Sequence, residues 1–377
     1  MPWRWGWSLP AAEFKILVIN PGSTSTKFAL YANERAKLVK TLRHSDEEMA
    51  QFKGRPILEQ QEFRSHLVES ELAAAGHNVQ ELSAVAGRGG LLRPLASGTY
   101  LVNGEMLAEL RRAERGEHAS NLGAYLAHDI AKHAGAEAYV VDPVSVDEWP
   151  PVARFSGLAA LERQCLSHAL NTKAVAKRYA RQAGRRYEEL KLIVAHVGSG
   201  ISVSAHSDGR MIDVTNSREE GAFSTERSGT VPVMKLVELC FSGKYNYKQV
   251  EAMLFREGGL YSYLGTKDLV EIERRIAEGD AQAALVFDAM VYQIAKEIGA
   301  MAAVLAGKVD AILLTGGMAH SEKLVAALTR QTQWIARVQA YPGEDELQAL
   351  AEGVLRVLHG EEQARELEPV HEPATTW

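Results

Sequence analysis

The sequence predicts an α/β protein that contains two similar domains. Apolar strands alternate with amphipathic helices along the chain, and one strand-turn-strand unit occurs twice. The length of 377 residues suits two domains. Hydrophobic residues make up 46% of the chain and charged residues 24%, which is typical of globular proteins that bury a core without disulfides.

The repeated unit pairs residues 15–23 with residues 191–199. Each copy begins with lysine and four apolar residues, continues with one polar residue, and ends in a Gly-Ser pair. An alignment without gaps then matches Ala29 with Ala205. We expect each copy to form a buried strand, a tight turn and a second strand, with a third strand at 210–214. The alternative is chance similarity between two apolar strands that end in glycine.

The remaining elements continue the α/β alternation. A short apolar run at 84–90 leads into Arg-Gly-Gly, and strands are expected at 138–141 and 309–314. Helices are expected at 118–133, 166–181, 233–240, 248–255, 268–277, 281–305, 321–329 and 347–358.

Charge and cysteine content argue against several classes of protein. The net charge of −6 does not suit a general nucleic-acid binder, which needs a basic face. Cys165 and Cys240 are far apart, so neither a disulfide framework nor a thiolate metal site is expected, and a reducing cytoplasm suits them. Residues 290–305 form the longest apolar stretch, but polar residues interrupt it, so no membrane span is expected. Residues 1–14 lack the apolar core of a secretory signal.

The first turn, residues 20–27, reads Asn-Pro-Gly-Ser-Thr-Ser-Thr-Lys. A turn of small residues after a strand presents backbone N–H groups and hydroxyls to an anion, and Lys27 adds a charge. It is not a P-loop, because the Gly-Lys-Ser/Thr ending is missing and a strand follows. The alternative is an ordinary hairpin turn.

Two further glycine-containing junctions and one arginine loop accompany this turn. Residues 196–200, His-Val-Gly-Ser-Gly, form the second copy of the turn, and residues 313–317 end a strand in Gly-Gly, where backbone can approach a ligand closely. In the loop 221–229, Arg227 can direct two donors at a carboxylate or phosphoryl oxygen. The alternatives are tight structural connections, and a surface arginine paired with Glu226.

Three other polar residues are candidates for chemistry. His118 and His168 can each donate to a phosphoryl oxygen, and Asp142 follows a strand and precedes a proline. The alternatives are structural histidines and a turn-capping aspartate. The sequence contains no zinc-type ligand spacing and no Gly-x-Ser-x-Gly motif.

Taken together, these segments resemble the acetokinase family, and within it the butyrate kinases. The resemblance implies two ribonuclease-H-like domains of the actin-like ATPase type around an ATP cleft. It places an acyl and phosphate side in residues 14–150 plus 350–377 and a nucleotide side in residues 151–349, with 1–13 as an extension. The matching segments follow in family order: 19–27, 87–92, 116–123, 141–143, 168–171, 195–202, 226–229, 314–317 and 342–346.

The resemblance also implies roles for individual residues. The catalytic group would comprise two arginines beside the acyl phosphate, two active-site histidines and an acid near the carboxylate and magnesium: Arg88, Arg227, His118, His168 and Asp142. The phosphate- and nucleotide-binding residues would be Asn20, Ser23, Ser25, Lys27, His196, Gly198, Ser199, Gly200, Gly316 and Gly317. Magnesium would be linked to Asp142 and Glu346, although Glu344 and Asp345 crowd the second position.

The chain departs from the butyrate kinase pattern at two places. Ser199 replaces a usual glycine, so either slight strain in the second turn or an altered nucleotide contact is expected, because serine resists positive φ. Two prolines expected before Arg227 are missing, which predicts a looser arginine loop.

The expected activity is reversible, in-line transfer of the γ-phosphoryl group of ATP, with Mg²⁺, to butanoate or a related short or branched fatty acid. The resemblance also implies a cytoplasmic homodimer or higher homo-oligomer with a small carboxylate substrate, and no nucleic-acid or membrane partner. An acetate or propionate kinase is one alternative. A non-catalytic actin-like nucleotide-binding module is another, although Arg88, Arg227 and His168 argue against it because nucleotide binding alone does not need them.

Overall fold

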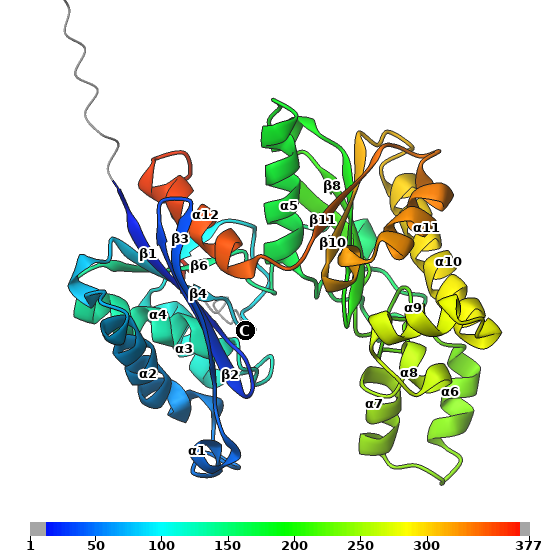
Figure 1. Cartoon of the computed structure of the whole chain (residues 1–377), viewed down its shortest axis with the longest axis horizontal. Helices are drawn as coiled ribbons and strands as arrows, with labels where there is room; N and C mark the ends of the chain where they lie inside the picture. The colour runs from blue at the N-terminus through cyan, green and yellow to red at the C-terminus, as the bar shows by residue number, and fades with distance from the viewer. Residues whose placement is uncertain (1–12, 370–377) are drawn as a thin grey trace, which may run out of the picture. The chain divides into compact units, whose positions relative to one another are not determined.

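The computed structural model describes residues 13–369, which divide into two compact units (Figure 1). The first unit contains residues 13–93, 98–143 and 346–369, and the second contains residues 94–97 and 144–345. The expected extension at 1–13 lies outside the described residues apart from Glu13, as does the end of the expected C-terminal segment, 370–377.

The first unit is built on a six-stranded mixed sheet with the order β3-β2-β1-β4-β6-β5. Every residue from Ile16 to Ile19 in the central strand is fully buried, so both faces of the sheet are covered. One face packs on α2 and α4 through Val68, Leu72, Leu122 and Leu126, and α12 contacts β1, β4 and β6. The strands are β1 (Lys15–Pro21), β2 (Ser25–Ala32), β3 (Arg35–Arg43), β4 (Ala84–Arg88), β5 (Thr99–Leu101) and β6 (Glu137–Val141). The helices are α1 (Asp46–Ala50), α2 (Gln61–Ala74), α3 (Gly104–Arg112), α4 (Asn121–Ala134) and α12 (Glu346–Leu358).

The second unit is built on a five-stranded mixed sheet with the order β11-β10-β7-β8-β9. Helix α5 covers one face, and α10 and α11 cover the other. Helices α6 to α9 form an insertion between β9 and α10, as the yellow-green segment of Figure 1 shows. The strands are β7 (Leu192–Val197), β8 (Ile201–Ser207), β9 (Arg210–Val214), β10 (Ala311–Gly316) and β11 (Val338–Pro342). The helices are α5 (Ala169–Gln182), α6 (Val233–Cys240), α7 (Tyr247–Phe255), α8 (Gly259–Leu264), α9 (Leu269–Ala277), α10 (Ala281–Val304) and α11 (Glu322–Thr332).

The two sheets repeat one pairing pattern, which confirms the predicted duplication. In the first, β1 pairs antiparallel with β2 and parallel with β4, and β4 pairs parallel with β6. In the second, β7 pairs in the same way with β8 and β10, and β10 with β11. The chain therefore has two copies of one α/β domain.

The register corrects the alignment of the two copies. Val18 lies opposite Ala29, but its counterpart Val194 lies opposite Ser204. The match of Ala29 with Ala205 is therefore wrong by one residue. The physical reason is the length of the turn, since four residues separate Pro21 from Thr26, whereas three separate Val197 from Ile201.

No helix within residues 13–369 combines the length and the apolar character that crossing a bilayer requires.

Candidate functional site

Three predicted residues lie at the same edge of the first sheet. Asn20 is near the end of β1, Arg88 ends β4, and Asp142 follows β6. Because these strands are parallel, their carboxyl ends meet at one edge, where α/β proteins bind ligands. Asn20 Nδ2 and Arg88 Nη1 donate to the same Glu346 oxygen, Oε2, at 2.5 and 2.7 Å. The first unit therefore brings Asn20, Arg88 and Glu346 together.

The three crowded acids before α12 have different partners. Glu344 Oε1 lies 3.1 Å from His196 Nε2, and Asp345, which is largely exposed, lies 3.8 Å from Arg178. Glu346 alone pairs with Arg88. This division singles out Glu346 as the acid beside the arginine and asparagine of the first unit.

A backbone contact between β4 and α4 fixes the position of Arg88. A Cβ at Gly87 would lie 1.9 Å from the Gly123 carbonyl oxygen, and one at Gly123 would lie 2.0 Å from the Arg88 carbonyl oxygen. Only glycine fits at either position, because any side chain would separate the strand from the helix. Both glycines lie in the segments that resemble the family, but their packing role was not predicted.

Asp142 and His118 are held by local hydrogen bonds. Asp142 Oδ1 accepts a bond from the Gly98 backbone N–H at 2.8 Å, and Asp142 adopts a positive φ of 37°. Strained backbone of this kind persists only where the surroundings impose it, and it is common at functional sites. His118 Nδ1 accepts a bond from the Ser120 backbone N–H at 3.2 Å and lies 2.8 Å from its hydroxyl. The catalytic roles of Asp142 and His118 stay predictions.

Of the predicted phosphate-binding residues of the first turn, Ser23 and Lys27 are exposed, whereas Asn20 and Ser25 are half-buried. Ser23 and Thr24 are exposed at its tip, and Gly22 N–H donates to the Ser25 carbonyl oxygen at 2.7 Å, which closes the turn. Lys27 lies opposite Asn20 in the strand pair and is exposed. The turn therefore places Lys27 on the strand beside the Asn20 position.

Two histidines stack at the carboxyl edge of the second sheet. The rings of His168 and His196 lie 3.7 Å apart and 6° from parallel. His196 Nδ1 lies 2.9 Å from Asn171 Oδ1, and because an amide oxygen can only accept, Nδ1 is the donor of this bond. His168 Nδ1 lies 3.0 Å from Ser202 Oγ. These bonds fix the orientation of both rings.

The predicted glycine positions of the second unit lie beside these histidines. Thr315 pairs with His196 across β10 and β7, and Gly316 follows with a φ of +90°. A Cβ at Gly316 would lie 2.4 Å from the Val197 carbonyl oxygen, so the strand ends in close backbone contact with the second turn. Gly317 starts the 3₁₀ turn that follows.

Arg227 lies against the second turn and forms no ion pair with an acidic residue of the described chain. A Cβ at Gly200 would lie 2.7 Å from Arg227 Nη1, so the guanidinium rests directly on the turn. Nη1 donates to the carbonyl and hydroxyl oxygens of Ser217 at 3.2 and 3.1 Å. Within residues 13–369, Nε and Nη2 of Arg227 donate no hydrogen bond. Burial is the main cause that lowers the pKa of Arg227.

The alternative pairing of Arg227 with Glu226 does not occur, since Glu226 Oε2 binds Lys267 Nζ at 2.7 Å. The second turn is also unstrained. Ser199 is not among the non-glycine residues with positive φ in the described chain, so the expected strain there is wrong. The reason is that the turn reverses the chain without a left-handed residue at its centre.

The arginine loop is held by hydrogen bonds, and the expectation that it is looser than in the butyrate kinases stays a prediction. Ser224 Oγ accepts from the Arg227 N–H at 3.0 Å, and the Ser224 N–H donates to the Arg227 carbonyl at 3.0 Å. The start of α8 adds a bond from the Gly258 N–H to the Glu226 carbonyl at 3.0 Å. These bonds connect the arginine loop to itself and to the start of α8.

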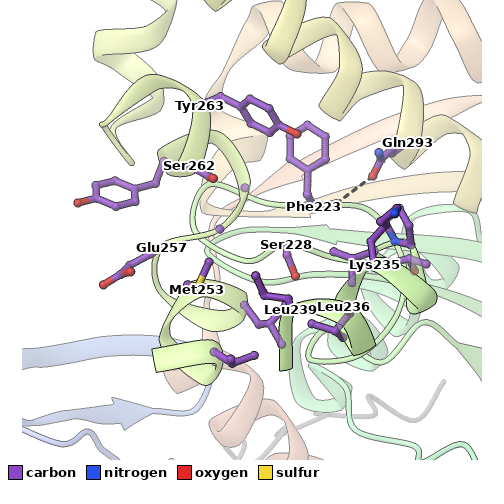
Figure 2. A pocket seen from close by; sticks show the side chains of 18 of the residues that line it. Phe223, Ser228, Lys235, Leu236, Leu239, Met253, Glu257, Ser262, Tyr263 and Gln293 are labelled. Atoms are coloured by element: carbon purple, nitrogen blue, oxygen red, sulfur yellow. Dashed lines mark hydrogen bonds between the residues drawn. The ribbon is translucent and has the colours of Figure 1, made fainter. Parts of the chain in front are cut away.

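A cavity of about 800 Å³ lies behind this loop, between α6, α7 and α8 (Figure 2). Leu236, Leu239 and Met253 line it, and Gln293 Oε1 accepts a bond from the Phe223 N–H at its edge. None of the predicted site residues lines this cavity. It therefore lies beside the arginine loop, which contributes Phe223 and Ser228 to its lining, and it is not the candidate site.

The carboxylates present suit magnesium that arrives with a nucleotide. No group of three or more His, Cys, Asp or Glu side chains within residues 13–369 is arranged to hold a metal ion. Mg²⁺ commonly uses only one or two protein carboxylates, and phosphates and water complete its shell. Glu346 and Asp142 provide such carboxylates at one sheet edge, so the donor set fits Mg²⁺ bound to a polyphosphate.

The sequence of the second unit identifies its relatives. Residues 161–337 match the model of the Acetokinase family. This segment of acetokinase type contains eight of the predicted site residues: His168, His196, Gly198, Ser199, Gly200, Arg227, Gly316 and Gly317.

Solved structures show the same fold over most of the chain. An acetate kinase from Porphyromonas gingivalis matches with a TM-score of 0.73 and 20% identity, covering 90% of this chain and 99% of that one. A propionate kinase from Francisella tularensis matches with a TM-score of 0.70 and 18% identity, covering 90% and 98%. An acetate kinase from Entamoeba histolytica matches with 0.74 and 14%, covering 92% and 100%. The predicted two-domain, actin-like ATPase fold is therefore confirmed.

Proposed function

We propose that this protein is a carboxylate kinase that transfers the γ-phosphoryl group of ATP to a short fatty acid. Arg227 carries the proposal, because its half-buried guanidinium lies on a glycine turn and has no acidic partner between residues 13 and 369. A buried cation is costly unless an anion pairs with it, so this position suits a phosphoryl group. The match of residues 161–337 to the Acetokinase family supports the same conclusion.

The chemistry needs charge neutralisation and alignment more than proton transfer. A carboxylate oxygen attacks the γ-phosphorus, the bond from phosphorus to the bridging oxygen breaks, and ADP leaves with the electron pair. No general base is required, because the carboxylate has no proton to lose. Positioning can contribute about 7–11 kcal/mol to such a reaction.

Residues of both units have roles in this proposal. Arg88 and Arg227 would neutralise the oxygens of the transferring group, and His168 would donate a hydrogen bond to it. The first and second turns would hold phosphates through backbone N–H groups. Glu346 and Asp142 would hold Mg²⁺, which when bound neutralises charge on the phosphates.

The proposed acceptor is butanoate or a related short or branched acid, because the motifs are most similar to those of butyrate kinases. Acetate or propionate is the second candidate, favoured by the acetate and propionate kinases among the similar structures. The test measures acyl phosphate and ADP formed from ATP, Mg²⁺ and acetate, propionate, butanoate or isobutanoate. We expect the highest kcat/KM with a four-carbon acid. Nucleotide binding without acyl phosphate from any acid would instead identify a non-catalytic nucleotide-binding module.

A further inference from the structure

Arg64 of α2 lies inside the first unit against the first turn, with none of its surface exposed. Its Nη1 donates to the Gly22 carbonyl at 2.8 Å and to the Ser25 carbonyl at 2.9 Å. Its Nη2 donates to the Ser23 carbonyl at 3.1 Å. The guanidinium of Arg64 therefore donates hydrogen bonds to three of the four backbone carbonyl groups of the turn, residues 22–25.

These contacts orient the opposite side of the turn. In a trans peptide, the C=O and the following N–H point in opposite directions. Because the Gly22 and Ser23 carbonyls face Arg64, the N–H groups of Ser23 and Thr24 face away from it. Neither N–H donates a hydrogen bond within residues 13–369, and both residues are exposed. Two successive outward N–H groups form a concave anion-binding arrangement.

The charge of Arg64 has no counter-ion in the described chain. Its remaining bonds, from Nε at 3.0 Å and Nη2 at 2.7 Å, go to the neutral amide oxygen of Gln60. Burial alone lowers the pKa of Arg64, to about 10, so it stays protonated at neutral pH. An uncompensated buried cation destabilises a fold unless an anion comes near it. The outward N–H groups are where such an anion would bind.

His44 and Thr26 complete the support of the turn. The His44 backbone N–H donates to the Thr24 carbonyl at 2.9 Å, which leaves no carbonyl of the turn pointing outward without a partner. Thr26 Oγ1 accepts from Arg64 Nη1 at 3.0 Å and lies 2.9 Å from His44 Nε2. The conformation of the turn is therefore set by side chains that never reach its outer surface.

We propose that Arg64 is a positioning residue for polyphosphate binding: its fork fixes the first turn with the Ser23 and Thr24 N–H groups outward, and its charge attracts the phosphates. The identity of the polyphosphate as ATP rests on the proposed function. The turn motif pointed to anion binding, but nothing in it identified an arginine 39 residues beyond Ser25.

The decisive experiment separates the effect of the positive charge of Arg64 from the effect of its hydrogen bonds to the backbone of the turn. Gln60→Glu places a carboxylate on the same two donors and leaves the contacts to the turn intact. Arg64→Lys keeps the positive charge and loses the planar guanidinium whose two Nη atoms donate to the turn. Binding of ATP and of AMP is measured by calorimetry without any acid acceptor, and thermal unfolding is followed in parallel. Gln80→Glu, at an exposed position, adds the same charge as a control.

We expect Gln60→Glu to unfold at or above the wild-type temperature and to bind ATP about tenfold more weakly, with AMP affinity within twofold. Arg64→Lys should also weaken ATP binding, and Gln80→Glu should match the wild type. ATP affinity within twofold of wild type in Gln60→Glu would overturn the role of the charge, even if Arg64→Lys does not fold. Equal losses for ATP and AMP would reduce Arg64 to general structural support. Because no acceptor is present, a wild type that phosphorylates no acid would refute the proposed function without affecting this result.

Discussion

The two turns at the sheet edges use an arginine in different ways. At the first turn, Arg64 lies behind the backbone and all three of its nitrogens donate to the turn or to Gln60. At the second turn, Arg227 lies on Gly200, and among the described residues its guanidinium donates only through Nη1, to Ser217. The same side chain therefore holds backbone where its donors are satisfied, and is available to a ligand where they are not.

The duplication makes this difference informative. Both turns follow the first strand of the same sheet pattern, but the second is one residue shorter. It is closed by the Gly198 N–H donating to the Gly200 carbonyl at 3.2 Å, and Ser224 Oγ donates to the Ser199 carbonyl. A hydroxyl thus supports the second turn where the first uses a guanidinium.

The largest expected effect follows from removing Arg227. Arg227→Ala should lower kcat by about 10²–10³, with less than a threefold change in ATP affinity, because the group is proposed to stabilise developing charge. Steady-state kinetics and ATP calorimetry measure the two quantities. Lys267→Ala, which removes the partner of Glu226 in the same region, is the control and should stay within twofold. Near-normal turnover in Arg227→Ala would break the contrast between the two turns.

The glycine beneath Arg227 gives a sharper test with a smaller effect. Gly200→Ala places a Cβ 2.7 Å from Arg227 Nη1 and should displace the guanidinium, lowering kcat by about tenfold to a hundredfold. Gly22→Ala is the matched change in the first turn, where the Cβ meets the flexible Ser25 Oγ at 3.1 Å and the Ser25 carbonyl oxygen at an ordinary contact distance of 3.5 Å. Its kcat should stay within about threefold of wild type. Equal losses in the two variants would contradict the proposed difference.

Substitutions of Asp345 and Glu346 test the proposed magnesium-linked role of the first unit independently of the two turns. Glu346→Gln removes the charge beside Arg88 and should lower kcat about tenfold and raise the Mg²⁺ concentration needed for half-maximal activity. Asp345→Asn is the control one residue earlier and should behave as wild type, since Asp345 is exposed and 3.8 Å from Arg178. A titration of activity with Mg²⁺ distinguishes them. The reverse ranking would move the magnesium-linked role to Asp345.

The smallest expected effect is on the pH dependence of the free energy of unfolding. It concerns two buried histidines, His206 and His44. Burial, and then the charge of Lys173, lower the pKa of His206 to about 3, and burial followed by Arg64 lowers that of His44. His206 stays neutral when folded, so its contribution is complete above the ordinary pKa of 6.5 and is lost as pH falls below it. The lowered pKa of His44 gives a contribution of the same sign. His206 should contribute up to about 1.4 kcal/mol per pH unit to the fall in unfolding free energy below pH 6.

Chemical denaturation at pH 7 and pH 5 measures this slope. His206→Asn should flatten it, whatever the stability of the variant at pH 7. His133 is an exposed control of opposite sign, because Glu69 raises its pKa and its small contribution is lost as pH rises. An unchanged slope in His206→Asn would show that the ring is not kept neutral by the fold.

The sequence alone determined the duplicated α/β architecture and most elements after residue 165. The helix expected at 233–240 coincides with α6, and the strand expected at 309–314 overlaps β10. These segments have strong apolar periodicity, and a glycine junction or cap marks many of their ends, so local signals were sufficient. The sequence also predicted the segments and residue types of the candidate site, because the residues that form a turn are neighbours in the sequence.

Only the tertiary structure decided which residues work together. Helix α2 was missed because its apolar residues form no clear stripe, and it carries Arg64, whose partners lie about 40 residues away. The choice of Glu346 among three neighbouring acids depended on Asn20 and Arg88, more than 250 residues away. Such long-range pairings follow from the order of strands in a sheet, which no local pattern encodes.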